Sequence, residues 1–300
     1  MELWIPITLA AAFCQNLRSA LQKHLKASLS TSGATFSRFL YAAPLAILYA
    51  ALLSSIGGFD LPAPDATFVS YMMIGGIGQI LATALLVYLF SFRNFAVGTT
   101  FSKTETIQTA LFGFLILGDR MTLTAALAIL ISLAGVFAIS SARAPRGLGG
   151  LIGSLTERTA LIGIASGACF GVSAVSYRAA SLSLGGDGFL MQAAFTLAAV
   201  TTFQTVLMAL YMRLREPGQI TAVLRSWRVS SLVGLTGMLA SAGWFTAMTI
   251  QNAAYVRALG QVELIFTFAA SYFVFGERSN PIELIGIALV TLGILVLLVG

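Results

Sequence analysis

Charged side chains are scarce in this sequence. They make up 9% of its 300 residues, whereas hydrophobic residues make up 58% and the mean hydropathy is +0.91. An average soluble domain is about 25% charged, so too few charges are present to cover a surface that faces water. The composition therefore predicts an integral membrane protein.

Cysteine and histidine are almost absent. Cys14 and Cys169 are too few for a disulfide framework, and His24 is the one histidine, so no metal cluster is expected. No GxxxxGK[ST] loop is present, which argues against direct use of ATP. An intramembrane enzyme would need a nucleophile and base or a metal cluster, so the sequence predicts no enzyme, no metal and no cofactor.

Ten apolar runs follow one another along the chain, each about as long as a crossing helix requires. They cover residues 3–25, 33–55, 67–90, 95–117, 121–141, 158–180, 188–211, 229–250, 253–275 and 281–299. Continuous runs of this length predict helices. We therefore expect an all-α fold with ten transmembrane helices.

A segment of the fourth run recurs in the ninth. FSKTETIQTALFGFLILGDR (101–120) aligns without a gap with LGQVELIFTFAASYFVFGER (259–278), at an offset of 158 residues. The alignment places Glu105 on Glu263. Several matches at one offset indicate an internal duplication.

The duplication predicts two five-helix repeats, over residues 1–141 and 158–300, joined by a linker over 142–157. Five is an odd number, so the second repeat would begin on the opposite side of the membrane from the first. The halves would then form an inverted repeat, which is typical of alternating-access transporters with a substrate site near the midplane.

Basic residues are unevenly divided between the two sets of predicted loops, and we interpret the net charge of +6 in this way rather than as a nucleic-acid site. Eleven lie after odd-numbered runs: Lys23, Lys26, Arg93, Arg143, Arg146, Arg158, Arg213, Arg215, Arg225, Arg228 and Arg278. Three lie after even-numbered runs: Arg120, Arg178 and Arg257. By the positive-inside rule, both termini of this multi-pass protein are expected to face outward.

Two corresponding segments carry a resemblance to a known family. ILGDRMTLTAALAILISLAGV (116–136) and VFGERSNPIELIGIALVTLGI (274–294) resemble an element that EamA-type members of the drug/metabolite transporter superfamily carry once per repeat. Thr106 and Leu264 stand where the family often has proline after the glutamate, so we expect straighter helices there. Among EamA-type members the chain most resembles the YddG-type exporters of aromatic and other neutral amino acids.

The resemblance implies a carrier in the bacterial inner membrane that exports small metabolites by alternating access. Neutral and aromatic amino acids are the expected substrates, with protons as the candidate coupling ion. Facilitated diffusion of drugs, purines or sugars is the alternative. A channel is less favoured because the sequence has no charged ring. Membrane lipid is the expected surrounding partner. The sequence does not indicate the oligomeric state.

Polar and aromatic residues inside the runs are the candidate substrate contacts. Glu105 and Glu263 are each expected about ten residues into a helix, roughly 15 Å deep, where they would bind a substrate amine, carry protons or brace two helices. Amides in lipid need a partner, and a tryptophan in mid-helix is away from the interface belt. The full set is Asn16, Gln79, Lys103, Glu105, Gln108, Tyr177, Trp244 and Glu263.

Lys103 has two interpretations. On a continuous helix it would lie about 200° around from Glu105, so the two side chains would point different ways. It would then either meet a substrate carboxylate or extend its stem toward the interface.

Overall fold

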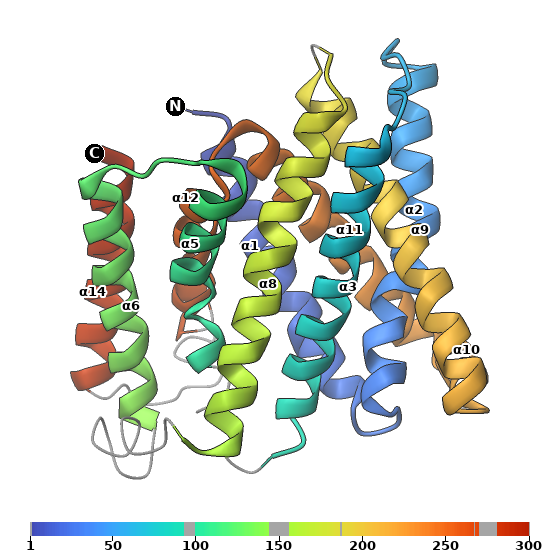
Figure 1. Ribbon diagram of the computed structural model, residues 1–300. Coiled ribbons are helices and arrows are strands. Elements are labelled where there is room, and N and C mark those ends of the chain that lie inside the picture. The colour runs from blue at the N-terminus through green and yellow to red at the C-terminus, as the bar shows by residue number, and fades with distance from the viewer. Residues whose placement is uncertain are drawn as a thin grey trace.

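All the regular structure in the described part of the chain is helical. The computed structural model describes residues 2–92, 100–143, 156–186, 188–266, 268–269 and 281–299. Its elements are α1 (Trp4–Leu25), α2 (Thr31–Ser55), α3 (Ala66–Leu89), α5 (Glu105–Leu117), α6 (Leu123–Arg143), α8 (Arg158–Ser183), α9 (Phe189–Arg215), α10 (Gln219–Arg225), α11 (Trp227–Ile250), α12 (Ala253–Leu259), the 3-10 helix η1 (Gly260–Val262) and α14 (Pro281–Val299). The long helices form one bundle, and the two chain ends lie at the same end of it (Figure 1).

Within the described residues, seven helices are long and apolar enough to cross a membrane: α2, α3, α6, α8, α9, α11 and α14. Many apolar side chains are exposed on the bundle, among them Phe114 at 60% and Leu123 at 77%. Water penalises apolar surface by roughly 25 cal/mol per Å², whereas acyl chains do not. The expectation of a helical membrane protein is confirmed in these terms, and the arrangement as ten helices in two inverted repeats stays a prediction.

The expected fourth span is interrupted directly before Glu105. Residues 100–102 are helical, Lys103 and Thr104 lie in a turn, and α5 then begins at Glu105. Hydroxyl side chains compete with helical backbone bonds, and the Thr104 hydroxyl donates to Phe101 O at 2.6 Å. The prediction that Glu105 lies ten residues into a continuous helix is therefore wrong, because it is the first residue of α5.

The ninth span is interrupted at the equivalent place. α12 ends at Leu259, and η1 lies directly before Glu263. Glycine is a weak helix former, and a Cβ on Gly260 would lie 2.6 Å from Cη2 of Trp244. The rotation of side chains expected along a continuous helix therefore does not hold across either interruption.

Helices from the two predicted halves pack against each other in pairs. α1 lies against α11, α3 against α8, α2 against α9, α5 against α12 and α6 against α14. Contacts between distant parts of the sequence therefore hold the bundle together, and they bring the interrupted spans, α5 and α12, side by side.

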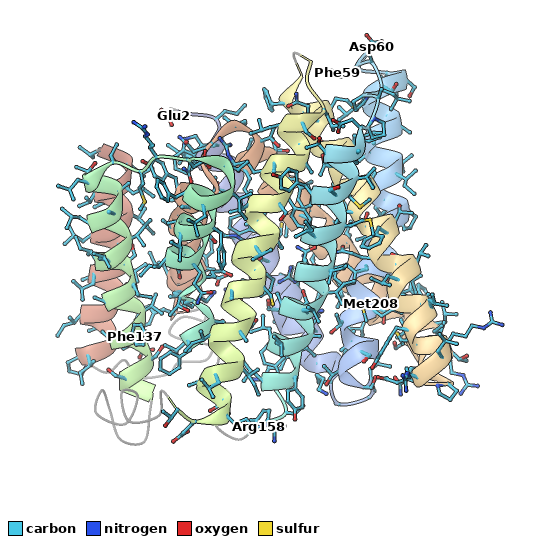
Figure 2. All side chains as sticks on the ribbon, viewed as in Figure 1. Glu2, Phe59, Asp60, Phe137, Arg158 and Met208 are labelled. Carbon is cyan, nitrogen blue, oxygen red and sulfur yellow. The ribbon has the colours of Figure 1, made fainter. Side chains whose placement is uncertain are left out.

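The basic residues gather at the end of the bundle away from the chain termini. Arg158 lies at that end, whereas Glu2 and Asp60 lie at the other (Figure 2). Arg178 and Arg257, which the topology argument counted with the loops, belong to α8 and α12. They therefore lie within helices, as Lys23, Arg158 and Arg228 of the larger set also do.

α6 and α14 cross with their backbones in contact. A Cβ on Gly135 would lie 2.6 Å from Gly286 O and 2.7 Å from Val290 N, both of which are backbone atoms. Small residues permit such close approach of helices in membranes. The crossing therefore depends on the absence of a side chain at Gly135.

We predict that Gly135→Ala lowers the Tm measured by thermal unfolding in detergent. Alanine is the better helix former by about 1 kcal/mol, but its methyl group would collide with the α14 backbone, and overpacking costs about 1–3 kcal/mol. The matched control is Gly113→Ala in α5, where the nearest atom to a new Cβ is 3.6 Å away and the Tm should stay the same or rise. Equal shifts in the two variants would contradict the close crossing.

Candidate functional site

A cavity of about 290 Å³ lies between α1, α3, the start of α5, α8 and residues 253–264, which we call the α12 segment. Leu86, Phe90 and Phe170 form an apolar part of its wall. Its charged lining residues are Arg18, Lys23, Lys103, Glu105, Arg257 and Glu263. A pocket that combines an apolar wall with a few convergent polar groups is the usual form of a small-molecule site.

The cavity runs from the middle of the bundle toward its basic end. Its lining follows α1 from Gln15 to Lys23 and includes Phe90, which is next to the last residue of α3. In Figure 1 these ends of α1 and α3 lie at the end of the bundle opposite the chain termini. The cavity therefore favours one side of the bundle.

The first ion pair at the cavity joins Lys103 to Glu263. The Gln15 amide donates to the second carboxylate oxygen of Glu263 at 3.0 Å, and the Asn16 amide donates to its backbone carbonyl at 3.1 Å. Glu263 is thus held by a cation and an amide at its carboxylate and by α1 at its backbone.

The second ion pair joins Arg257 to Glu105, with 3.6 Å between guanidinium nitrogen and carboxylate oxygen. The Arg257 guanidinium also lies 4.9 Å from the centre of the Trp244 ring and 6.0 Å from that of Phe170, distances at which a cation is attracted to an aromatic face. The Trp244 ring nitrogen donates to the Gln15 amide oxygen at 3.0 Å. Gln15 therefore links the two ion pairs.

The two pairs cross between the predicted repeats. Lys103 and Glu105 come from the first repeat, and each is paired with a residue of the second, Glu263 or Arg257. Breaking a buried ion pair by removal of one partner costs about 3–5 kcal/mol, because the other charge stays buried. The two pairs therefore connect the halves of the chain at the cavity.

Neither interpretation of Lys103 describes its contact in the structure. Its ammonium group pairs with Glu263, and Lys103 and Glu105 line the same cavity. The prediction that they point different ways is wrong, because the 100° rotation per residue of a helix does not apply across the turn at Lys103 and Thr104.

Three buried arginines were missed as candidate residues. Arg18 and Arg38 are 2% and 3% exposed, and Arg257 is 6% exposed. Their signal was present in the sequence, because Arg18 and Arg38 are charges well inside apolar runs, just as Lys103 is. Charges in such positions are rare and typically mark function in membrane proteins.

Arg18 and Arg38 have different surroundings. Arg38 donates to the hydroxyls of Thr83 at 3.0 Å and Ser241 at 3.4 Å. Arg18 lines the cavity, and its Nε atom has no hydrogen-bond partner within the described residues. Gly237 faces the stems of both arginines, since a Cβ there would lie 3.2 Å from Arg38 Cγ and 3.4 Å from Arg18 Cδ.

Gln79 and Tyr177 belong to a separate polar cluster between α3, α8 and α9. The Tyr177 hydroxyl donates to the Gln79 amide oxygen at 3.1 Å, and the Gln204 amide donates to the same oxygen at 3.0 Å. The Tyr177 ring stacks on Phe245 with 4.4 Å between ring centres. The structure does not bring these two predicted site residues to the cavity lining, and their bonds join three helices.

Gln108 lies near the start of α5, outside the cavity lining. Its amide nitrogen donates to the Thr104 hydroxyl at 3.0 Å, and its oxygen has no hydrogen-bond partner in the described part of the chain. This side chain therefore supports the turn that precedes Glu105. Of the eight predicted residues, four line the cavity: Asn16, Lys103, Glu105 and Glu263.

The side of the ion pairs away from the cavity is closely packed. The Trp244 ring lies against Gly260, and the Gln261 amide donates to the Thr106 hydroxyl at 2.8 Å. Trp244 thus closes the space behind Arg257 rather than lining the main cavity. The bond from Gln261 to Thr106 adds a third polar link between α5 and the α12 segment.

Arg178 closes the same side nearer the chain termini. Its guanidinium donates to Met248 O at 2.6 Å and Gln251 O at 2.7 Å, at the end of α11. It also pairs with Asp119, just after α5, at 3.4 Å. These contacts satisfy carbonyls that the end of α11 leaves without helical partners, and they tie three segments together.

One comparison with known proteins matches the first part of the chain. Residues 2–141 match the model of the EamA-like transporter family, in agreement with the expected resemblance, and the YddG-type subgroup stays a prediction. No curated protein matches the chain. A solved structure whose description reads "Crystal structure of protein" aligns over 99% of this chain and 97% of its own, at 18% identity and a TM-score of 0.68. At that identity the likeness shows a shared fold.

We predict that neutralising one member of an ion pair destabilises the protein more than neutralising both. Lys103→Met would leave Glu263 without its cation, and Glu263→Gln would leave Lys103 without its anion, each at a cost of about 3–5 kcal/mol. The double variant buries no unpaired charge. Its Tm in detergent should exceed that of either single variant, and strictly additive losses would contradict the pairing.

Proposed function

We propose that this chain, whose residues 2–141 match the model of the EamA-like transporter family, is a secondary carrier that exports small metabolites by alternating access. The observation that carries the proposal is the charged central cavity, which extends toward the basic end of the bundle while the other side of its ion pairs is packed. A carrier that waits for substrate on one side of the membrane needs this asymmetry.

The pairwise packing supports an inverted repeat of two five-helix halves. Exchange of the halves would turn the contact of α1 with α11 into that of α8 with α3, and both are extensive. The same exchange would leave the pairs α2 with α9, α5 with α12 and α6 with α14 unchanged. Interrupted helices beside the site, as before Glu105 and Glu263, also accompany inverted repeats in transporters.

Alternating access then requires the halves to move relative to each other around the cavity. The crossed ion pairs and the bond from Gln261 to Thr106 link them on one side. We propose that these links open when the cavity closes at the basic end. The contacts of Arg178 would be broken in the same movement.

Carboxylate-bearing metabolites fit the site best among the candidate substrates. The cations that line the cavity can bind a carboxylate, and Phe90 and Phe170 can pack against an apolar or aromatic body. Neutral and aromatic amino acids therefore remain candidates. Uncharged purines or sugars, carried by facilitated diffusion, would leave the cations of the cavity unused. A cationic drug would be repelled by the same cations.

Protons are the proposed coupling ion. A substrate anion that draws Lys103 or Arg257 away would leave Glu263 or Glu105 without its cation, and the freed carboxylate could then take up a proton. The substrate would then be bound at a cation and the proton at a carboxylate, so the two would be carried together in the same direction.

We predict counterflow of amino acids in proteoliposomes that contain the purified chain. Preloaded phenylalanine or leucine should accelerate uptake of the labelled solute relative to protein-free liposomes, and an imposed pH gradient should change the rate. Equal uptake rates with and without the pH gradient would rule out proton coupling, and facilitated diffusion would then be the mechanism. No counterflow of any amino acid, nucleoside, sugar or organic acid would contradict the carrier itself.

The proposed location is the bacterial inner membrane, with both termini outward. The basic end of the bundle would face the cytoplasm by the positive-inside rule. The cavity would then extend toward the cytoplasm, which is the side from which an exporter receives its substrate.

We predict that Arg225→Cys reacts with a membrane-impermeant thiol reagent only after the cells are opened. Arg225 and Asp60 are both exposed. α10, which ends at Arg225, lies at the end of the bundle opposite Asp60 (Figures 1 and 2). Asp60→Cys is therefore the matched variant that should react in intact cells, with Cys14 and Cys169 replaced by alanine in both. The reverse pattern would place the termini in the cytoplasm.

A further inference from the structure

The ion pairs of the cavity leave one of its arginines without a carboxylate. Lys103 uses Glu263, and Arg257 uses Glu105, so both carboxylates of the lining are engaged. Within the described ranges, no carboxylate lies at ion-pairing distance from Arg18. Glu105 also acts on Arg18 electrostatically, but its carboxylate is paired with Arg257, so Arg18 has no ion pair of its own among the described residues.

Arg18 has the features of a binding group rather than a structural one. A guanidinium carries five N–H donors, and buried polar atoms are nearly always hydrogen-bonded. Arg38, beside it, follows this rule through two hydroxyls. Arg18 is 2% exposed, lines the cavity and has an unpartnered Nε among the described residues.

The packing of α11 holds Arg18 in this position. Gly237 leaves room for the stems of Arg18 and Arg38, which lie side by side against it. The neighbouring charges of Arg38 and Arg257 add to the positive field at Arg18. An anion entering the cavity would therefore be attracted to Arg18 by more than one cation.

We propose that the preferred substrate is a small organic anion whose carboxylate or phosphate group binds the guanidinium of Arg18, more tightly than the zwitterionic amino acids named above bind. The proposal deepens the carrier function stated above and rests on it. Guanidinium binds either group through two parallel hydrogen bonds. The apolar body of the substrate would lie along Leu86, Phe90 and Phe170.

The same charges favour a net anion over a zwitterion. The ammonium group of a zwitterion would need a carboxylate, and Glu105 and Glu263 are both engaged. It would also lie among Arg18, Lys103 and Arg257. A substrate with one negative group and no positive group avoids both costs.

Ligands with the same ring and different charged groups test this proposal. Binding of phenylacetate, phenyl phosphate, phenylacetamide, phenethylammonium and phenylalanine would be measured by calorimetry on the purified full chain in detergent. We expect phenylacetate or phenyl phosphate to bind at least about 10-fold more tightly than the other three, as expected for a charge-assisted bond. The tighter of the two anions identifies the charged group.

Variants of Arg18 connect the selectivity to this residue. Arg18→Gln should lower the affinity for the preferred anion about 10-fold or more, and Arg18→Lys should restore part of it, because lysine keeps the charge and loses the planar fork. Removal of this buried charge should leave the Tm unchanged or raise it. Arg228→Gln, at an exposed arginine beside Trp227, is the control and should bind like the parent.

Two results would overturn the proposal. One is binding of phenylacetamide or phenethylammonium as tight as that of both anions, which needs no variant. The other is an Arg18→Gln variant that folds and binds the anion like the parent. If amino acids or nucleosides show counterflow but these anions do not bind, the carrier function stands and the anion proposal fails. If the anions bind through Arg18 but nothing is transported, the anion-binding site stands and the carrier function fails.

Discussion

A charge inside a membrane protein has to be balanced within the protein, and two crossed ion pairs meet that constraint here. A single charge at the centre of a membrane helix costs about 2.5–3.5 kcal/mol by insertion scales, and more by other estimates. Lys103 and Glu105 each find a partner across the chain, Glu263 and Arg257. The position of α5 against the α12 segment follows from these pairs.

The interruptions of the two helices make the pairing geometrically feasible. A continuous helix would turn Lys103 away from Glu105, and the turn before α5 lets both reach the same cavity. Glu105 is then the first residue of α5, where the helix dipole favours a negative charge. Gly260 allows the equivalent interruption next to Trp244, and Trp244 in turn packs against Arg257.

Hydropathy was sufficient to predict the helical membrane class, because seven of the long helices in the described residues are long apolar runs. The interruptions could not be predicted, since they depend on one hydroxyl bond from Thr104 and on the contact of Gly260 with Trp244. The pairing was missed for a different reason. Comparison of the two repeats finds the residues that they share, and the glutamates recur at an offset of 158 residues. The cations do not recur, because Lys103 corresponds to Gln261 and Arg257 corresponds to Thr99.

The role of Gln79 and Tyr177 illustrates a further limit of sequence reasoning. Both are polar groups in apolar runs, as the lining residues are, but they bond to Gln204 on α9 and brace three helices. Polar character alone does not separate a brace from a binding group. The better criterion is a buried donor that has neither a hydrogen-bond partner nor an ion pair. Among the arginines of the described cavity lining Arg18 meets it, whereas Arg257 has an unpartnered Nε but pairs with Glu105.

Cross-linking across the cavity tests the crossed pairing most directly. In a chain with Cys14 and Cys169 replaced by alanine, Lys103→Cys and Glu263→Cys would be combined and treated with a short bis-thiosulfonate reagent. The pairing predicts an intramolecular cross-link at high yield, as mass spectrometry of the digested, folded protein would detect. A folded protein that labels at both cysteines without joining them would contradict the arrangement on which the proposed site depends.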